Sequence, residues 1–398
     1  MRIAFLTHEP FYPPSGGGSA EAVYLVQEMV SRGHEVEIFC PTIEDPKGVA
    51  SKFGVKFHEF KTWRMGRYAA FRNFKYLAYP FFLEHMVKSA AINRPFDLIL
   101  SQHAIAAVAA GRLRARLGCP VVMNSLDFLT GFMETWPAYV APPFLLAMLK
   151  RFELSLPQRY AADAVLTVSE TLADYISTTG FPKNRIVPIH YGYDPELFPL
   201  RTNVPPVHPP IVIMHGSLDK HHLQQIAFDA VRTVSDQKPE AIFRFVGNVS
   251  TTLQGFMERI RKQIPTARLE TTGFVSYDRI GAELSKAHLG IVPYEESTGT
   301  HCAFVAKVVE YLAVGLPVVS TRLQSISHYF AKEPRVSFTD FNGIGFGKAI
   351  LLRLSTQETE VQTSAIEASA RVQKNLNWRS ISAKAIDFSE NAATGFQR

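Results

Sequence analysis

The sequence has 398 residues, which is more than one ordinary core holds and enough for two domains of roughly 200 residues each. A hydrophobic content of 46% with 20% charged residues excludes a disordered or fibrous chain, and the formal net charge is a modest +6. Apolar stretches such as 139–149 run about ten residues, half of the ~20 that a membrane-spanning helix needs.

The first half alternates short apolar runs with helical patterns, which is typical of α/β folds with parallel sheets. Residues 3–7 predict a buried strand, and residues 19–32 predict a helix that ends at Gly33. Ser169 is expected to cap a helix that ends near Gly180. Further strands are expected at 36–40, 98–100, 121–123 and 164–168.

Residues 201–210 form the predicted domain boundary, because four prolines in ten residues sustain neither a helix nor a central strand. The α/β alternation then restarts. The glycines of 343–347 predict a turn entering a helix, in preference to a nucleotide-binding loop. The second half is expected to hold strands at 211–214, 241–246, 289–292 and 318–320, with helices at 222–234 and 256–263.

A glycine loop, Ser15 followed by Gly16, Gly17 and Gly18, lies between the first strand and the first helix. Glycines let the backbone approach a ligand closely, and a helix N-terminus offers free amides to a phosphate. Ligands of doubly wound sheets bind at the carboxyl ends of the strands, where this loop lies. The loop is therefore a candidate phosphate-binding element, with a plain glycine turn as the alternative.

A more specific pattern surrounds Glu310 in the second half. Its carboxylate is expected on a short helix between two strands, where it can accept hydrogen bonds from a ribose diol. The backbone of Ala303, Phe304 and Val305 would point amides at a diphosphate, and Lys307 would neutralise the leaving phosphate. The alternative is a surface helix with a solvated Lys/Glu pair.

These patterns resemble the GT-B glycosyltransferases, and most closely the large retaining family 4, over nearly the whole chain. The resemblance rests on an ordered series of segments, each weak alone: 3–6, the glycine loop, 32–36, 96–99, 167–170, 190–194 with Phe198, 246–247, 272–275, 292–294, 307–319 and Trp378. It implies two Rossmann-like, doubly wound parallel-sheet domains with an interdomain cleft. The implied divisions are an acceptor-side domain at 1–200, the connector at 201–210, a donor-side domain at 211–374 and a C-terminal helix at 375–398 that crosses back to the first domain.

By the same resemblance, Glu310 binds the nucleotide ribose and the Gly16 to Gly18 loop approaches the donor phosphates and the acceptor. His103 is placed by the fold on the acceptor side, with a buried structural histidine as the alternative. Asp127 matches an aspartate common in the family.

Three positions depart from the family pattern. Leu126 stands where a histidine usually precedes the aspartate, and Cys302 stands where a first glutamate is usual. Gly216 is followed by Ser217 in place of an arginine, and Lys220 is the candidate for the family's nearby lysine. Lys307 is expected to take over phosphate neutralisation in this branch.

The implied activity is transfer of a sugar from a UDP- or GDP-linked donor to a glycan, lipid-linked or other small acceptor, with retention of configuration and without a cofactor. No Asp-x-Asp pair occurs in the sequence, which favours a metal-independent reaction. Two alternatives stay open. One is a non-catalytic nucleotide-sugar-binding subunit, and the other is a sugar-nucleotide epimerase or hydrolase.

Basic and aromatic residues interleave over 56–76, a pattern that suits an anionic membrane surface, a polyanionic acceptor or nucleic acid, with a solvated helical face as the alternative. Nucleic acid is not an expected partner. Three cysteines without a CxxC pair favour a reducing cytoplasm, and the N-terminal apolar run is too short for a signal peptide. We therefore expect a cytoplasmic protein that peripherally contacts the inner face of the membrane.

Overall fold

The structure is a computed structural model, and it describes residues 1–14, 17–61, 74–202, 208–355 and 358–395. It divides into two compact units, each described below by itself. The first unit comprises Met1–Phe128, Phe144–His190 and Arg379–Arg398, and the second comprises Leu129–Pro143 and Tyr191–Trp378. The chain therefore enters the second unit briefly at Leu129–Pro143 and again at Tyr191, ahead of the proline-rich connector.

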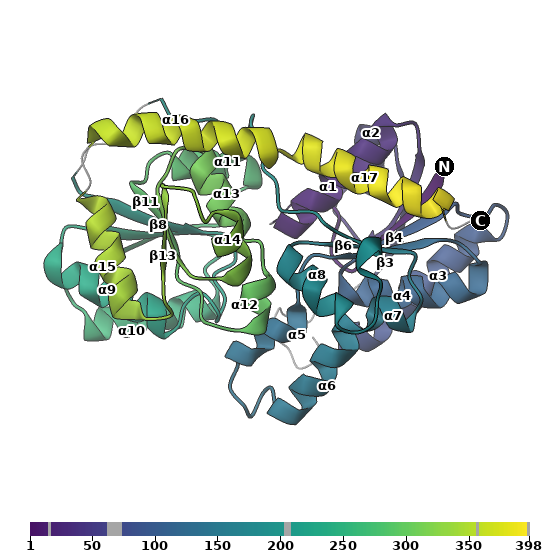
Figure 1. Cartoon of the computed structure of the whole chain (residues 1–398), viewed down its shortest axis with the longest axis horizontal. Coiled ribbons are helices and arrows are strands. Elements are labelled where there is room, and N and C mark those ends of the chain that lie inside the picture. Colours follow the sequence, from purple (N-terminus) through teal and green to yellow (C-terminus); the bar gives the residue numbers. More distant parts are fainter. Residues whose placement is uncertain (15–16, 62–73, 203–207, 356–357, 396–398) are drawn as a thin grey trace. The chain divides into compact units, whose positions relative to one another are not determined.

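The described part of the first unit contains a seven-stranded sheet with strand order β3-β2-β1-β4-β5-β6-β7, in which every neighbouring pair is parallel. Helices lie on both faces of the sheet (Figure 1). The strands are β1 Arg2–Thr7, β2 Glu35–Pro41, β3 Lys56–Phe60, β4 Leu98–Gln102, β5 Val121–Ser125, β6 Ala164–Thr167 and β7 Ile186–Pro188. The helices are α1 Gly17–Ser31, α2 Pro46–Phe53, α3 Phe74–Ala91, α4 His103–Leu117, α6 Pro143–Leu154, α7 Leu156–Arg159, α8 Glu170–Ser177 and α17 Trp378–Gly395.

The described part of the second unit contains a six-stranded parallel sheet with strand order β10-β9-β8-β11-β12-β13. The strands are β8 Ile211–His215, β9 Ile242–Val246, β10 Arg268–Gly273, β11 Leu289–Val292, β12 Val318–Thr321 and β13 Val336–Thr339. The helices are α5 Leu129–Phe132, α9 Gln225–Gln237, α10 Thr251–Gln263, α11 Tyr277–Leu284, α12 Thr298–Cys302, α13 Ala306–Ala313, α14 Gln324–Tyr329, α15 Gly343–Leu354 and α16 Glu358–Asn375. Both sheets thus have the Rossmann strand order, and the predicted fold class is confirmed.

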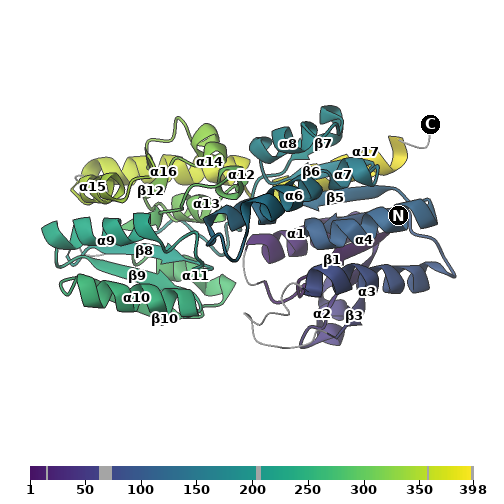
Figure 2. The ribbon, with the colours of Figure 1, turned by 90° about the horizontal axis from the view of Figure 1, so that it is seen from below.

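Local chemistry explains the first-unit elements that the sequence predicts. The residues of β1 are all buried, as a central parallel strand requires. Gly33 ends the first helix with a φ of +80°, a conformation that glycine adopts without strain. The Ser169 hydroxyl accepts a hydrogen bond from the Leu172 amide and caps α8 as expected. Figure 2 shows α3 and α4 side by side over one face of the sheet.

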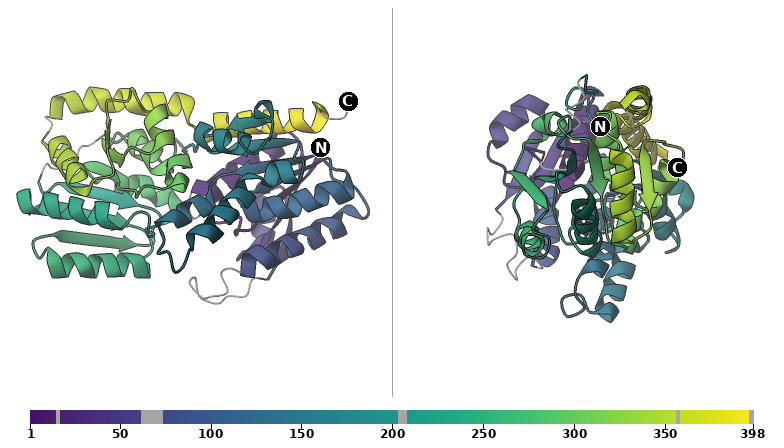
Figure 3. Two further views of the ribbon diagram at one scale, coloured as in Figure 1. Left: turned by 60° about the horizontal axis from the view of Figure 1, so that its bottom comes forward. Right: turned by 90° about the vertical axis from the view of Figure 1, so that its left-hand side faces the viewer.

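The final helix, α17, contributes its residues from Arg379 onward to the first unit (Figure 3). The guanidinium of Arg32, at the end of α1, donates to Asp387 at 2.6 Å and to Glu390 at 3.0 Å. His34 Nε2 lies 2.6 Å from the other carboxylate oxygen of Glu390. The segment 32–34 therefore holds α17 by charge-assisted contacts as well as by packing.

The glycine run at 343–347 opens α15, which confirms the prediction of a helix start. The Asn342 side chain accepts from the Gly345 amide and caps the helix. A Cβ on Gly347 would lie 2.6 Å from Thr233 Cβ, and one on Gly343 would lie 2.5 Å from Asp229 Cβ. Two of the glycines therefore allow α15 to pack closely against α9.

Four strands were not predicted, and all of them are the outer strands of the two sheets: β3, β7, β10 and β13. β3 takes up the start of the 56–76 segment, where Lys56 lies 3.6 Å from the Glu37 carboxylate. The rest of that segment's predicted membrane contact falls on residues whose side chains lie outside the described part. Among the described residues, no helix combines the length and the apolar character that crossing a membrane requires.

Candidate functional site

In each sheet the first three strands in chain order run toward one edge, and the fourth strand starts on the other side of the first. The strand order therefore changes direction between β1 and β4 in the first unit and between β8 and β11 in the second. Loops that leave neighbouring strands in opposite directions open a crevice at their carboxyl ends, where ligands of such folds bind. Gly18 and His103 lie at the first of these places, and Gly216, Lys307 and Glu310 lie at the second.

Glu310 lies on α13, between β11 and β12, and its side chain is only 6% exposed. Its Oε2 atom lies 2.5 Å from Nε2 of His215, the last residue of β8. Among the described residues, no hydrogen-bond partner is seen for the second carboxylate oxygen. The expected short helix is confirmed, and the alternative of a solvated Lys/Glu pair on its surface is wrong.

Gly216 follows His215 and has a φ of +95°. A Cβ at this position would lie 3.3 Å from Cε and 3.4 Å from Nζ of Lys307, so the glycine leaves room for that lysine. The Lys307 ammonium donates a hydrogen bond to the Tyr294 hydroxyl at 3.0 Å. The cation of Lys307, the buried carboxylate of Glu310 and the glycine backbone at position 216 therefore lie together at the end of β8.

Two histidines pack beside this cation. The ring centroids of His221 and His222 lie 5.3 Å and 4.3 Å from that of Tyr294. Burial and the nearby Lys307 charge lower the pKa of His221 to about 3, and burial lowers the pKa of His222 well below its usual range. Both rings are neutral at pH 7, so Lys307 supplies the positive charge here.

The segment Ala303, Phe304 and Val305 joins α12 to α13 and is buried. The Ala303 amide donates to the Gly299 carbonyl at 3.1 Å and ends α12, so the prediction that it points at a diphosphate is wrong. The amides of Phe304 and Val305 lead into the first turn of α13, where a helix has no internal acceptors for its N–H groups. Lys220 lies on an exposed turn, and among the described residues no hydrogen bond or ion pair joins it to Lys307 or Glu310. The structure therefore brings the 303–310 residues together and leaves Lys220 outside the cluster.

In the first unit, Gly16 lies outside the described residues and Gly17 begins α1. The Gly18 carbonyl accepts a hydrogen bond from the Gln102 side chain at 2.8 Å. A Cβ on Gly18 would lie 3.4 Å from His103 Nε2 and 3.5 Å from Leu126 Cδ1. The glycine loop therefore packs directly against His103.

His103 is the first residue of α4 and has a φ of +65°, which is unusual for a residue other than glycine. It is 5% exposed, and its ring packs edge-on against His8 with centroids 5.1 Å apart. Among the described residues, neither ring nitrogen of His103 has a hydrogen-bond partner. A strained backbone carrying an unsatisfied ring is a feature that clusters at functional sites.

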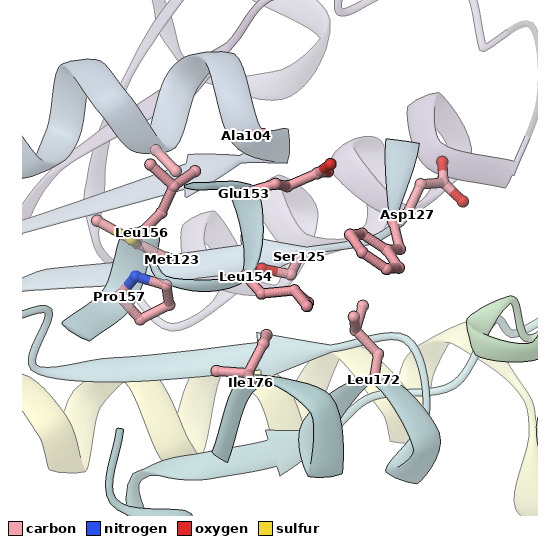
Figure 4. Close-up of a pocket in the computed structure, with 12 residues that line it drawn as sticks. Ala104, Met123, Ser125, Asp127, Glu153, Leu154, Leu156, Pro157, Leu172 and Ile176 are labelled. Carbon is pink, nitrogen blue, oxygen red and sulfur yellow. The ribbon is translucent and has the colours of Figure 1, made fainter. Parts of the chain in front are cut away.

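Asp127 follows β5 and lines a small pocket in the first unit, together with Ser125 and residues of α4, α6, α7 and α8. Figure 4 shows Asp127 and Leu156 on opposite sides of this pocket, with Glu153 between them and Leu172 and Ile176 along the facing side. The residues that line the pocket are mostly apolar, with two carboxylates among them.

A second buried carboxylate escaped prediction. Glu21, on α1, accepts hydrogen bonds from Asn124 at 3.2 Å and from Gln102 at 3.4 Å. Burial raises the pKa of Glu21 to about 8. Gln102 also donates to the Gly18 carbonyl, so Glu21 helps to orient the side chain that holds the glycine loop. Glu21 lies three residues after the loop, on the helix face toward the strand ends, and this position is the sequence feature that could have predicted its role.

The three departures from the family pattern differ in their surroundings. Leu126 and Cys302 are fully buried, so each fills space in the core. Ser217 is exposed and follows Gly216. Among the described residues, no three His, Cys, Asp or Glu side chains gather in an arrangement that could hold a metal ion.

Comparison with family models supplies the decisive observation. The model for Glycosyltransferase Family 4 matches residues 15–197, and the model for Glycosyl transferases group 1 matches residues 209–342. The chain belongs to the GT-B glycosyltransferases. As a member of this group it is a glycosyltransferase by family, and each model covers most of one Rossmann-like sheet. Comparison with curated proteins finds no significant match.

Solved structures agree with the GT-B fold. Sucrose-phosphate synthase from Thermosynechococcus elongatus superposes with a TM-score of 0.81 at 15% identity, over 98% of each chain. Anabaena HepE in complex with UDP-glucose gives 0.71 at 17% identity, over 97% of this chain and 98% of that one. WaaG, a glycosyltransferase involved in lipopolysaccharide biosynthesis, gives 0.65 at 14% identity, over 99% and 100%. At these identities the similarity shows the fold alone.

Proposed function

We propose that this glycosyltransferase moves a sugar from a nucleotide-sugar donor to a glycan, lipid-linked or other small acceptor, with retention of configuration and without a metal. The observation that carries the proposal is the buried carboxylate of Glu310 at the end of β8 and β11, oriented by His215. A carboxylate fixed at this position of a Rossmann sheet suits the hydroxyls of a ribose.

The donor half of the proposal follows from what the second unit can bind. His215 engages Oε2 of Glu310, which leaves Oε1 to accept a hydrogen bond from a ribose hydroxyl. The amides of Phe304, Val305 and Ala306 and the Lys307 ammonium suit a diphosphate. Anabaena HepE was crystallised with UDP and with UDP-glucose, which supports a UDP-linked donor here.

The chemical step requires charge to be stabilised on the departing diphosphate while an acceptor hydroxyl approaches the sugar. Lys307 carries a fixed positive charge, held by the Tyr294 hydroxyl and flanked by the neutral rings of His221 and His222. A preorganised cation of this kind stabilises developing negative charge without rearranging. The sequence holds no Asp-x-Asp pair for a bridging metal, which supports metal independence.

The acceptor half of the proposal assigns His103, Asp127 and the glycine loop to the sugar being transferred and to the acceptor. The unsatisfied ring of His103 can donate to a sugar hydroxyl or accept from one. Gly18 lies against that ring without a side chain in the way. Asp127 lines a pocket of the same unit and is a candidate to orient the acceptor hydroxyl.

The test is nucleotide release in the presence of nucleotide sugars and a panel of acceptors. The Lys307→Ala variant is expected to lower kcat by about 10²–10³-fold, the usual effect of removing one group that stabilises developing charge. Lys262→Ala, on the exposed side of α10, is the matched control and is expected to leave kcat unchanged. Equal turnover of wild type and Lys307→Ala would remove Lys307 from the mechanism.

The same assay separates the competing functions. Binding of nucleotide sugars with no turnover across the panel would favour a non-catalytic subunit, a reading prompted by Leu126, Ser217 and Cys302. Conversion of the donor without any acceptor would favour an epimerase or hydrolase.

A further inference from the structure

Helix α6 carries large apolar side chains on its outside. Phe144 is 73% exposed and Met148 is 67% exposed, while Leu145 and Phe152 are also exposed. Leu146 is the one buried residue among the described residues of this helix. Side chains of these types are usually buried, and a contiguous exposed group of them marks an interaction surface.

The exposed residues share one face. Phe144, Met148 and Phe152 follow each other at four-residue spacing, and Leu145 adjoins Phe144, so they line one side of the helix. The C-terminal end of the helix is anchored, because Glu153 and Leu154 line the first unit's pocket (Figure 4). We call the four exposed residues Phe144, Leu145, Met148 and Phe152 the α6 face.

The charges beside the α6 face are positive. Arg151 is exposed next to Phe152, and the Arg159 guanidinium lies 5.3 Å from the Phe152 ring centroid. Lys150 lies on the same helix, 5.9 Å from the ring centroid of Phe128. The helix has one acidic residue, Glu153, and its side chain lines the pocket. The apolar face is therefore bordered by cations.

We propose that the α6 face docks the protein on an anionic lipid bilayer. Protruding apolar side chains enter the acyl boundary, and the neighbouring cations pair with anionic headgroups. A helix of 12 residues is about 18 Å long, shorter than the ~30 Å hydrocarbon core, so it lies in the interface. This surface consists of residues other than those assigned to the donor, and it differs from the predicted membrane contact at 56–76.

The experiment is co-sedimentation of the full chain with vesicles of phosphatidylcholine, with and without phosphatidylglycerol, at low and high salt. Wild type is expected to bind the anionic vesicles and to be released by salt. The double variant Phe144→Ser with Met148→Ser is expected to weaken binding by about ten-fold or more, because the apolar anchors are gone. Arg151→Glu is expected to weaken binding at low salt.

Two controls have matched exposure elsewhere: Ile92→Ser, which is 79% exposed, and Leu352→Ser on α15, which is 72% exposed. Both are expected to bind like wild type. Thermal unfolding of each variant shows whether it folds, and titration with nucleotide sugars shows whether the donor site is intact. A folded double variant that keeps donor binding and loses vesicle binding supports the proposal.

Three results would overturn the proposal. The first is that wild type binds neither vesicle at low salt. The second is that the double variant binds as tightly as its controls, which assigns the bilayer contact to another segment, such as 56–76. The third is that wild type does not bind vesicles and light scattering shows the double substitution splitting a dimer, which makes the α6 face a contact between copies of this chain.

Discussion

At the residue scale, the two buried carboxylates have opposite surroundings. Glu310 faces a histidine 2.5 Å away, whereas Glu21 is surrounded by the neutral amides of Asn124 and Gln102. Burial without a cation raises the pKa of Glu21 to about 8, so this side chain keeps its proton at neutral pH. The protonated acid is part of the structure that supports the Gly18 backbone.

The shift predicts how stability depends on pH. The unfolded chain ionises Glu21 near 4.5, whereas the folded chain retains the proton up to about 8. The contribution of Glu21 is therefore fully present below about 4.5 and is lost as the pH rises through 8. Glu21→Gln, which cannot ionise, should unfold at higher temperature than wild type at pH 8.5 and show a flatter pH dependence between 5 and 8. If the unfolding temperatures of wild type and variant changed with pH in the same way, Glu21 would ionise at its ordinary pKa in the folded chain.

Substitution of His103 should affect activity and stability differently. Its φ of +65° costs about 1–3 kcal/mol in a histidine, and asparagine tolerates this conformation better. His103→Asn should therefore leave the melting temperature unchanged or raise it, while kcat falls because the ring is lost. Thermal unfolding and initial rates measured on one preparation check both halves. A variant with full activity would make His103 a purely structural residue.

At the element scale, the packing of α15 on α9 depends on two glycines that the sequence alone presents as a turn signal. Alanine in a helix is favoured over glycine by about 1 kcal/mol, so a free site gains from Gly→Ala. A Cβ at Gly347 meets Thr233 Cβ at 2.6 Å, and overpacking of this kind costs about 1–3 kcal/mol. The steric cost outweighs the gain in helix propensity.

Gly347→Ala should therefore lower the melting temperature. Gly345→Ala is the matched control in the same helix, since the nearest atom to its Cβ is Asn342 Oδ1 at 3.6 Å, an ordinary contact. Thermal unfolding of the two variants and wild type measures the difference. If Gly345→Ala and Gly347→Ala changed the melting temperature equally, close packing against Thr233 would not explain the glycine.

The elements that the sequence predicts are the ones with a strong local pattern. Central strands such as β1, β8 and β11 are apolar runs because parallel strands are covered on both faces. The four outer strands are partly exposed and carry mixed residues. β10, for instance, reads Arg-Leu-Glu-Thr-Thr-Gly, and Arg244 of β9 pairs with Glu270 there. Such a pattern does not differ from that of a loop.

The candidate site divides in the same way. Glu310 and Lys307 were found from their own motif, because helix position and residue type are local properties. The contact of Glu310 with His215 joins residues 95 positions apart, and that of Lys307 with Tyr294 joins two elements. Both follow from the order of β8, β11 and β12 in the sheet, which no short sequence window contains.

At the scale of the whole molecule, one arrangement occurs twice. Each unit places a glycine and a polar cluster at the point where its sheet changes direction: Gly18 with His103 after β1 and β4, and Gly216 with Lys307 after β8 and β11. The donor proposal rests on the second unit and the acceptor proposal on the first. The second-unit cluster is the more complete, because it combines a carboxylate, a cation and helix amides.

The most direct measurement is calorimetric titration of the full chain with a panel of nucleotides and nucleotide sugars, repeated on Glu310→Ala. Losing a hydrogen bond to a charged group costs about 1.5–3 kcal/mol, so we expect the best ligand to bind about 10–150-fold more weakly. Glu310→Gln, which keeps the side-chain shape, is expected to fall between, and the exposed Glu258→Ala on α10 should bind like wild type. Equal affinity of wild type and a folded Glu310→Ala for every ligand, or no binding of any nucleotide sugar to wild type, would contradict the assignment of Glu310 to the donor.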